Sequence, residues 1–388
     1  MTNYLLIALC VIILVSYIFD ITSKYTKVPG VILLIITGVI SRYALEYFNI
    51  AIPDLSGLLP LMGTLGLILI VLEGSLDLTL RREKQGLIVG SINTALWLFI
   101  IFEAIFAFIL VKFYNVQLDI ALLNTIPIGI ISSAVAIPSA AGLKSNDREF
   151  IVYESSFSDI VGILAFDFIL INSGSIGRGL LGFFLEFCLT IILSIVVTAG
   201  LAYILHKITH HVKYVIITTV VVLVYTLAKL IHMPSLLVVL IFGLILNNNH
   251  LFKNRVSVRF INFTSFNSDL TSFKHITGEL TFIVRSFFFI IFGYYTSILD
   301  ILNLDNLLLA SIISFSIFIL RGLFFRYILR ISLNPLMFFA PRGLITILLF
   351  LSIPYTKLLP FMTQGLVTQI IFITILMMTF GTMFLKKL

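Results

Sequence analysis

The sequence predicts an all-α polytopic membrane protein with about 13 transmembrane helices. Hydrophobic residues make up 60% of the 388 residues and charged residues only 11%, and the mean hydropathy is +1.15. A water-soluble domain of this length would have to expose large apolar patches at that composition. The apolar residues also fall into runs of the length that crosses a bilayer. Finally, the basic residues between these runs lie mostly on alternate sides, as membrane topology requires.

The expected spans follow one another along the whole chain. The first is interpreted as a retained helix, because no basic residue precedes it and no small-residue cleavage site follows it. Only three residues follow Leu385, so we expect a single transmembrane domain over residues 1–388 without a soluble carboxyl-terminal domain. The spans are expected at 4–20, 29–48, 55–78, 87–111, 119–142, 149–171, 180–205, 214–231, 234–247, 276–297, 307–328, 335–353 and 365–385.

The placement of lysine and arginine predicts the orientation. Cytoplasmic loops carry the excess of basic residues, so we expect the amino terminus outside and the carboxyl terminus in the cytoplasm. The net charge of +7 is thereby explained by topology, and no nucleic-acid partner is expected. An amphipathic surface helix or a plain loop is expected over 248–274. On the predicted cytoplasmic side lie 17 of the 25 basic residues: Lys24, Lys27, Arg81, Arg82, Lys84, Lys144, Arg148, Lys207, Lys213, Lys253, Arg255, Arg259, Lys274, Arg326, Arg330, Lys386 and Lys387.

Two of the predicted spans contain helix breakers. The fifth carries Ser132, Ser133 and Pro138, and the twelfth carries Pro341-Arg342-Gly343. The two spans are seven apart and therefore cross the membrane in opposite directions. Such a pair indicates inverted repeats with two crossed discontinuous helices around a transport site, although prolines also kink membrane helices without any function. We expect a transport bundle that includes 119–171 and 276–353, with the remaining helices as a scaffold.

Ionisable residues inside the spans are the candidate functional groups. Each costs about 2.5 to 3.5 kcal/mol to insert at mid-membrane, so such residues are rare without a role. Arg285 is a candidate for charge compensation, either of a carboxylate or of the ends of the broken helices. The group comprises Glu73, Glu103, Glu154, Asp159, Asp167, Arg285, Arg321 and Arg342.

The sixth span carries the most informative of these groups. At 100° per residue, Ser155 and Asp159 lie about 40° apart on one face of a helix, so a hydroxyl and a carboxylate can jointly hold a small cation. Glu154 lies about 140° from Asp159 and is expected to form a structural ion pair with Arg342, because a buried carboxylate needs a cationic partner. The alternative for Asp159 is a structural ion pair with Arg285.

The run from Glu154 to Asp159 resembles the Glu-Ser-x-x-Asn-Asp signature of the monovalent cation/proton antiporter superfamily, in particular the sodium/hydrogen exchanger family. Three further segments resemble motifs of this family and occur in the same order: Leu65–Asp77, Phe287–Gly293 and Pro341–Leu344. The resemblance thus extends over nearly the whole chain. It implies the antiporter fold, exchange of Na⁺, K⁺ or Li⁺ for H⁺, a homodimer in a bacterial inner membrane, and no cofactor besides the transported ions.

The resemblance also implies roles for individual residues. Asp159 would bind a proton or a cation in turn with help from Ser155, and Glu154 would pair with Arg342. Glu73 would contribute from further out. The family often has Thr-Asp-Pro at the first helix break, where this chain has Ser132 and Ser133, and Ser158 stands where other branches have Asn or a second Asp. The absence of that second acid predicts electroneutral exchange, whereas the Ser-Ser-x-Ala pattern resembles the potassium-efflux branch and leaves the cation open.

Two other functions remain compatible with the sequence. One is a channel-like or transport-inactive scaffold of the same fold that acts as a sensor or assembly platform. The other is a sodium-coupled symporter of organic anions. Enzymatic activity is not expected, because no metal-ligand set, phosphate-binding loop or nucleophile motif stands out in the sequence.

Overall fold

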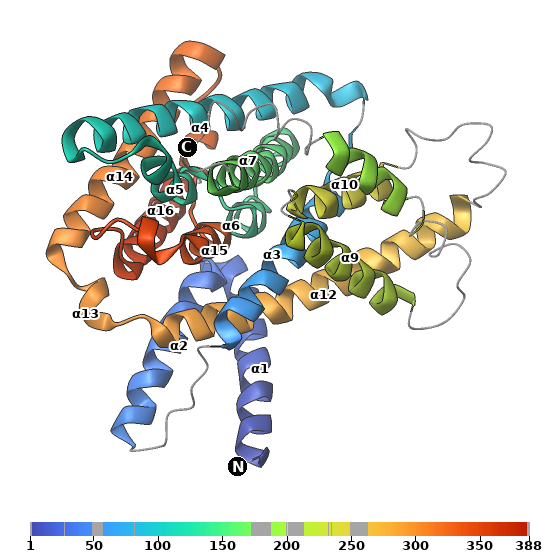
Figure 1. Ribbon diagram of the computed structural model, residues 1–388, viewed down its shortest axis with the longest axis horizontal. Helices are drawn as coiled ribbons and strands as arrows, with labels where there is room; N and C mark the ends of the chain where they lie inside the picture. The colour runs from blue at the N-terminus through green and yellow to red at the C-terminus, as the bar shows by residue number, and fades with distance from the viewer. Residues whose placement is uncertain are drawn as a thin grey trace.

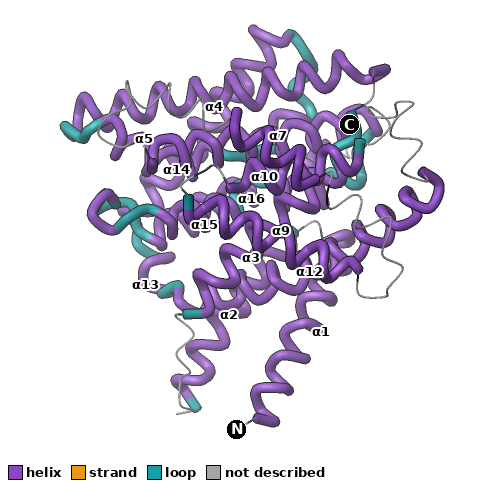
Figure 2. The backbone as a smooth tube through the Cα atoms, turned by 45° about the vertical axis from the view of Figure 1, so that its right-hand side comes forward, coloured by secondary structure: helices purple, strands orange, loops and turns teal. Residues whose placement is uncertain are grey.

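The computed structural model describes residues 2–26, 28–48, 57–80, 82–171, 188–198, 200, 213–231, 233, 235–248 and 263–385. Within these ranges the regular secondary structure is helical and no strand is present (Figure 2). Eight of the described helices, the two parts of the broken fifth span counted together, are long and apolar enough to cross a membrane. Shorter apolar helices lie at Leu9–Ser23, Cys188–Thr198 and Ser235–Asn247. The all-α membrane fold class is therefore confirmed.

The helices follow the predicted spans closely. The seventh span is described only over Cys188–Thr198, and residues 249–262 of the proposed amphipathic segment lie outside the described ranges. The uninterrupted helices are α1 (Thr2–Thr26), α2 (Gly30–Tyr47), α3 (Leu58–Asp77), α4 (Gln85–Tyr114), α7 (Ser145–Ile171), α9 (Lys213–Leu230), α10 (Ser235–Asn247), α12 (Phe263–Tyr295), α13 (Ile298–Ile301), α14 (Leu304–Leu323) and α16 (Gln364–Leu385).

One predicted boundary is wrong by several turns. The tenth span was expected to begin at residue 276, but α12 begins at Phe263. Hydropathy detects only the apolar part of a helix, whereas backbone hydrogen bonds continue through the polar residues that precede it. Residues 263–274, which were interpreted as part of a loop or surface helix, therefore form the first part of α12.

The helices pack as two groups (Figure 1). In one group, α12 packs on α2 and α3, and α3 also contacts α10. In the other, α4 packs on α7 and on the first discontinuous helix, and α14 packs on α16. The sequence had placed residues 276–297 in the transport bundle with the broken helices, yet the main partners of α12 are α2 and α3.

Both expected helix breaks are present, and they meet. The first discontinuous helix consists of α5 (Leu118–Gly129) and α6 (Ser133–Ser139), with an extended stretch between them. The second consists of a 3₁₀ turn (Leu336–Phe338), an extended stretch and α15 (Leu344–Ser352). The backbone N–H of Ser132 donates to the carbonyl of Pro341 over 2.9 Å, so the two extended stretches satisfy each other where a bilayer offers no water.

A buried ion pair joins α7 to α14 and corrects one prediction. Glu154 pairs with Arg321, not with Arg342: both guanidinium Nη atoms of Arg321 donate to the two carboxylate oxygens, one of them over 2.6 Å. The side chains are only 1% and 2% exposed. Arg321 also donates from Nε to the carbonyl of Leu336 over 2.9 Å and lies 4.6 Å from the ring centroid of Phe325. Helical periodicity indicated which face Glu154 occupies, but not which of several arginines faces it.

We expect Glu154→Gln and Arg321→Met each to lower the thermal stability of the purified protein. Breaking one side of a buried ion pair leaves an uncompensated charge and costs about 3–5 kcal/mol. The double variant should lose much less than the sum of the two single losses, because the pair is then removed as a unit. Thermal unfolding in detergent measures this coupling. A coupling of Glu154 with Arg342 as large as that with Arg321 would contradict the assigned partner.

Candidate cation-binding site

Asp159 lies on α7 opposite the break in the first discontinuous helix. It is 7% exposed, and the hydroxyl of Ser133, the first residue of α6, donates to its Oδ2. The backbone N–H of Ser133 also hydrogen bonds to the carboxylate. Oδ1 has no hydrogen-bond partner among the described residues, and no ion pair joins Asp159 to Arg285 or to another described cationic side chain. Asp159 is thus a buried acid without a described counter-ion.

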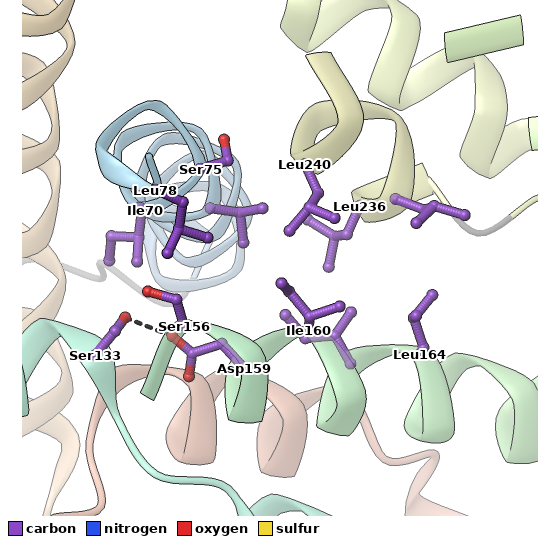
Figure 3. A pocket seen from close by; sticks show the side chains of 14 residues that line it. Ile70, Ser75, Leu78, Ser133, Ser156, Asp159, Ile160, Leu164, Leu236 and Leu240 are labelled. Carbon is purple, nitrogen blue, oxygen red and sulfur yellow. Dashed lines mark hydrogen bonds between the residues drawn. The ribbon is translucent and has the colours of Figure 1, made fainter. Parts of the chain in front are cut away.

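A small cavity lies beside this carboxylate. Its volume is about 30 Å³, which is enough for a single water molecule or ion. Asp159, Ser133, Ser156 and Ser75 supply the polar part of its wall. Figure 3 shows α7 along one side of the cavity, with α3 and α10 facing it. The rest of the wall is apolar: Ile70, Val71, Gly74, Leu78, Ile160, Ile163, Leu164, Leu236, Leu237 and Leu240.

Other predicted site residues serve the backbone rather than the cavity. Ser155 donates its hydroxyl to the carbonyl of Ile151 over 2.7 Å, and it does not line the cavity beside Asp159. Its role beside a cation stays a prediction, because a hydroxyl that donates to a carbonyl keeps its acceptor lone pairs. The hydroxyl of Ser158 accepts from the N–H of Ile131 over 2.9 Å, which ties α7 to the break.

Ser132 and Gly343 occupy the tightest point of the crossing. The hydroxyl of Ser132 is buried and has no hydrogen-bond partner among the described residues. A Cβ atom added at Gly343 would lie 2.6 Å from that oxygen and 3.0 Å from the Cβ of Ser132. The two extended stretches can approach this closely only because one of them carries glycine here.

Glu73 and Arg285 line a second and much larger cavity, of about 1250 Å³. Glu73 is attracted electrostatically by Arg285 and hydrogen bonds to Thr281. Residues 134 and 135 of α6 line the same cavity, and so do Lys144 and the first three residues of α7, 145–147. The helix α6 therefore separates the two cavities, since Ser133 faces one and its two successors face the other. The structure places Glu73 on the large cavity, apart from the small one beside Asp159.

Arg342 caps the end of α5. Its guanidinium donates to the carbonyls of Ile128 and Gly129, the latter over 3.3 Å, and to that of Ala340 over 3.2 Å. The last carbonyls of a helix lack intrahelical donors and carry the negative end of its dipole. A buried arginine at this position satisfies these carbonyls at mid-membrane. The ion pair with Glu154 was predicted for Arg342, but its hydrogen-bond partners here are backbone carbonyl oxygens.

Glu103 belongs to the same region, although sequence reasoning gave it no role. This residue of α4 is 6% exposed and accepts a hydrogen bond from the hydroxyl of Thr125. It attracts Arg342 electrostatically, as does Glu154. Glu103, Glu154, Arg321 and Arg342 thus form a buried cluster of two carboxyl and two guanidinium groups. In the sequence, the signal for Glu103 was a carboxylate inside an apolar helix. Only the fold shows which arginine Glu103 faces.

The comparisons with known proteins agree with this architecture. The family model for the transmembrane region of sodium/hydrogen exchangers matches residues 10–387. A search of curated proteins finds no significant match. A solved structure of the sodium proton antiporter MjNhaP1 from Methanocaldococcus jannaschii at pH 8 is 20% identical, covers 98% of this chain and 99% of its own, and has a TM-score of 0.72.

An electron-microscopy structure of the same archaeal antiporter is 17% identical, covers 99% of this chain and 95% of its own, and has a TM-score of 0.71. At these identities the two structural matches show a shared fold. The family model, in contrast, covers nearly the whole chain. The chain therefore belongs to the sodium/hydrogen exchanger family.

Proposed function

We propose that this protein exchanges a monovalent cation, Na⁺ or K⁺ and also Li⁺, for a proton at Asp159. One observation carries the proposal: a buried carboxylate with an unpaired oxygen lies on a cavity the size of a single ion and has no counter-ion among the described residues. An ionised carboxylate in this position is costly unless a positive charge joins it. A cation and a proton can each supply that charge, but not both at once.

Competition for one carboxylate is sufficient for coupling. When Asp159 carries a proton or a cation, it contributes no net charge. The loaded site can then switch from facing one side of the membrane to facing the other. The empty site is an uncompensated anion and cannot cross. Each cation moved in one direction is therefore exchanged for a proton moved in the other.

The large cavity indicates from which side of the membrane ions reach the site. It reaches Lys144 and the start of α7 at 145–147, and the positive-inside rule assigns this end of α7 to the cytoplasm. We therefore assign an inward-facing state, with the amino terminus outside and the carboxyl terminus in the cytoplasm of a bacterial inner membrane. Glu73 lies on the route by which a cation would approach α6. Alternating access would move the bundle of broken helices against the scaffold of α2, α3 and α12, which would also form a homodimer.

The acid content of the small cavity supports electroneutral exchange. Asp159 is the acid that lines this cavity, so one positive charge suffices to neutralise it. Ser132 and Ser133 stand at the crossing in place of a second acid. One cation should therefore exchange for one proton.

Replacing Asp159 with Asn should abolish exchange in proteoliposomes, because the amide binds neither a proton nor a cation with compensation of charge. The measurement is the internal pH, followed with a dye after separate additions of Na⁺, K⁺ and Li⁺. Asp167→Asn, two turns further along the same helix, is the matched control and should retain most of the activity. Full exchange by Asp159→Asn would refute the assignment. Ion flux without proton movement in the unaltered protein would instead indicate a channel, and sodium-driven uptake of a carboxylate a symporter.

Electroneutrality has its own test. With one cation moved per proton, the exchange rate should not change when an inside-negative membrane potential is imposed on the proteoliposomes, and no potential should develop during turnover. A potential-sensitive dye and the pH dye, read in the same vesicles, measure both quantities. A rate that rises or falls with the imposed potential would contradict the one-for-one stoichiometry.

A further inference from the structure

Glu103 is a buried carboxyl group that the proposed exchange does not use. It lies on α4 and is 6% exposed. Its Oε2 lies 2.5 Å from the hydroxyl oxygen of Thr125 on α5, and its Oε1 has no hydrogen-bond partner among the described residues. The described ion pairs do not include Glu103. An anion with so few partners is costly inside a membrane protein, so the hydrogen bonds around Glu103 indicate which form the fold favours.

The hydroxyl of Thr125 has more acceptors within reach than it has protons. Besides Oε2 of Glu103 at 2.5 Å, the carbonyl of Ala121 lies 3.1 Å away. A threonine hydroxyl donates once and keeps two acceptor lone pairs. If Glu103 were ionised, its carboxylate and the carbonyl would compete for that one proton. If Glu103 is protonated, the acid donates to Thr125 and Thr125 donates to Ala121, so each contact has its own proton.

The other oxygen of Glu103 lies against the last turn of α5. A Cβ atom added at Gly129 would lie 2.5 Å from Oε1 of Glu103 and 3.1 Å from the ring of Phe102. Thr125 and Gly129 are four residues apart and therefore lie on the same face of α5. The carbonyl of Gly129 accepts a hydrogen bond from Arg342 over 3.3 Å. Glu103 thus contacts the same turn that the arginine of the crossing caps.

We infer that Glu103 is held as a protonated acid and is a positioning residue: by donating to Thr125 it fixes the last turn of α5 against α4, and with it the break that leads to Ser133. This inference goes beyond the exchange proposed at Asp159, and only its transport measurement rests on that exchange. Ionisation at alkaline pH would remove the donated proton and place an anion in an apolar helix contact. The end of α5 is then held less firmly, and exchange slows.

Arg342 is the charged group that acts on Glu103 among the described residues. It attracts the ionised form, but its guanidinium donates to backbone carbonyls and not to Glu103. Glu154 of α7 and Arg321 of α14 act in turn on Arg342 and pair with each other. The charged turn Arg82–Lys84 precedes α4 and lies about five helical turns from Glu103. The alternative is therefore an ionised Glu103 that compensates Arg342.

Infrared spectroscopy of the purified protein tests the proton directly, because a protonated carboxyl group has a C=O stretching band that a carboxylate lacks. At neutral pH, in an Asp159→Asn background, this band should lose intensity when Glu103→Gln is added. Glu149→Gln is the matched control, since Glu149 is paired with Lys84, and it should leave the band unchanged. Thr125→Val removes the hydroxyl that accepts from the acid and should move the band to higher frequency.

Exchange in proteoliposomes gives the second measurement. The amide of Glu103→Gln can donate to Thr125 and cannot ionise, so this variant should exchange within twofold of the unaltered rate at neutral pH and lose less of that rate as the pH rises. Glu103→Met has a similar length but no donor, and should lower the rate severalfold at every pH. Thermal unfolding in detergent should show little change for Glu103→Gln.

An unchanged carboxyl band in Glu103→Gln would overturn the inference, and so would an unmoved band in Thr125→Val. A large loss of stability or a failure to fold in Glu103→Gln would also contradict it, because that result is expected when an anion that compensates Arg342 is removed. The same holds if Glu103→Gln declines at alkaline pH as the unaltered protein does. The proposed function fails separately, if Asp159→Asn still exchanges ions, and the infrared result then still decides the protonation of Glu103.

Discussion

The crossing of the two broken helices is the constraint on which the rest of the structure depends. Where α5 and the second discontinuous helix stop, backbone groups are left without intrahelical partners in a solvent that supplies none. The N–H of Ser132 meets the carbonyl of Pro341, and Arg342 binds the last carbonyls of α5. Gly343 permits the close approach. The break that exposes Ser133 to Asp159 is stable because of these bonds.

A buried arginine at the crossing in turn requires buried acids around it. Glu103 faces Arg342 from α4, and Glu154 faces it from α7 while binding Arg321 directly. Asp159 accepts a hydrogen bond from Ser133 but has no counter-ion among the described residues. In the proposed function, the structural ion pair and the transport site are therefore two carboxylates of one helix, Glu154 and Asp159.

The two cavities differ in their walls. The large cavity reaches α6 and is also lined by Lys144 and the first residues of α7, whereas the cavity beside Asp159 is lined mainly by leucine and isoleucine side chains. Apolar walls do not replace the water of a cation, so in the proposed exchange the oxygens of Asp159 and Ser133 have to supply this replacement.

The sequence by itself determined the membrane class, most of the spans, the two breaks and the position of Asp159 inside an apolar helix, because hydropathy, helix breakers and charges within apolar runs are properties of local sequence. It assigned Arg342 to Glu154, and it could not show which arginine or which hydroxyl faces each acid. Those choices depend on which helices face each other and on side-chain rotation, and residues far apart in the chain settle both. Only the tertiary structure joined Glu154 to Arg321, brought Glu103 to Arg342 and set the hydroxyl of Ser133 against Asp159.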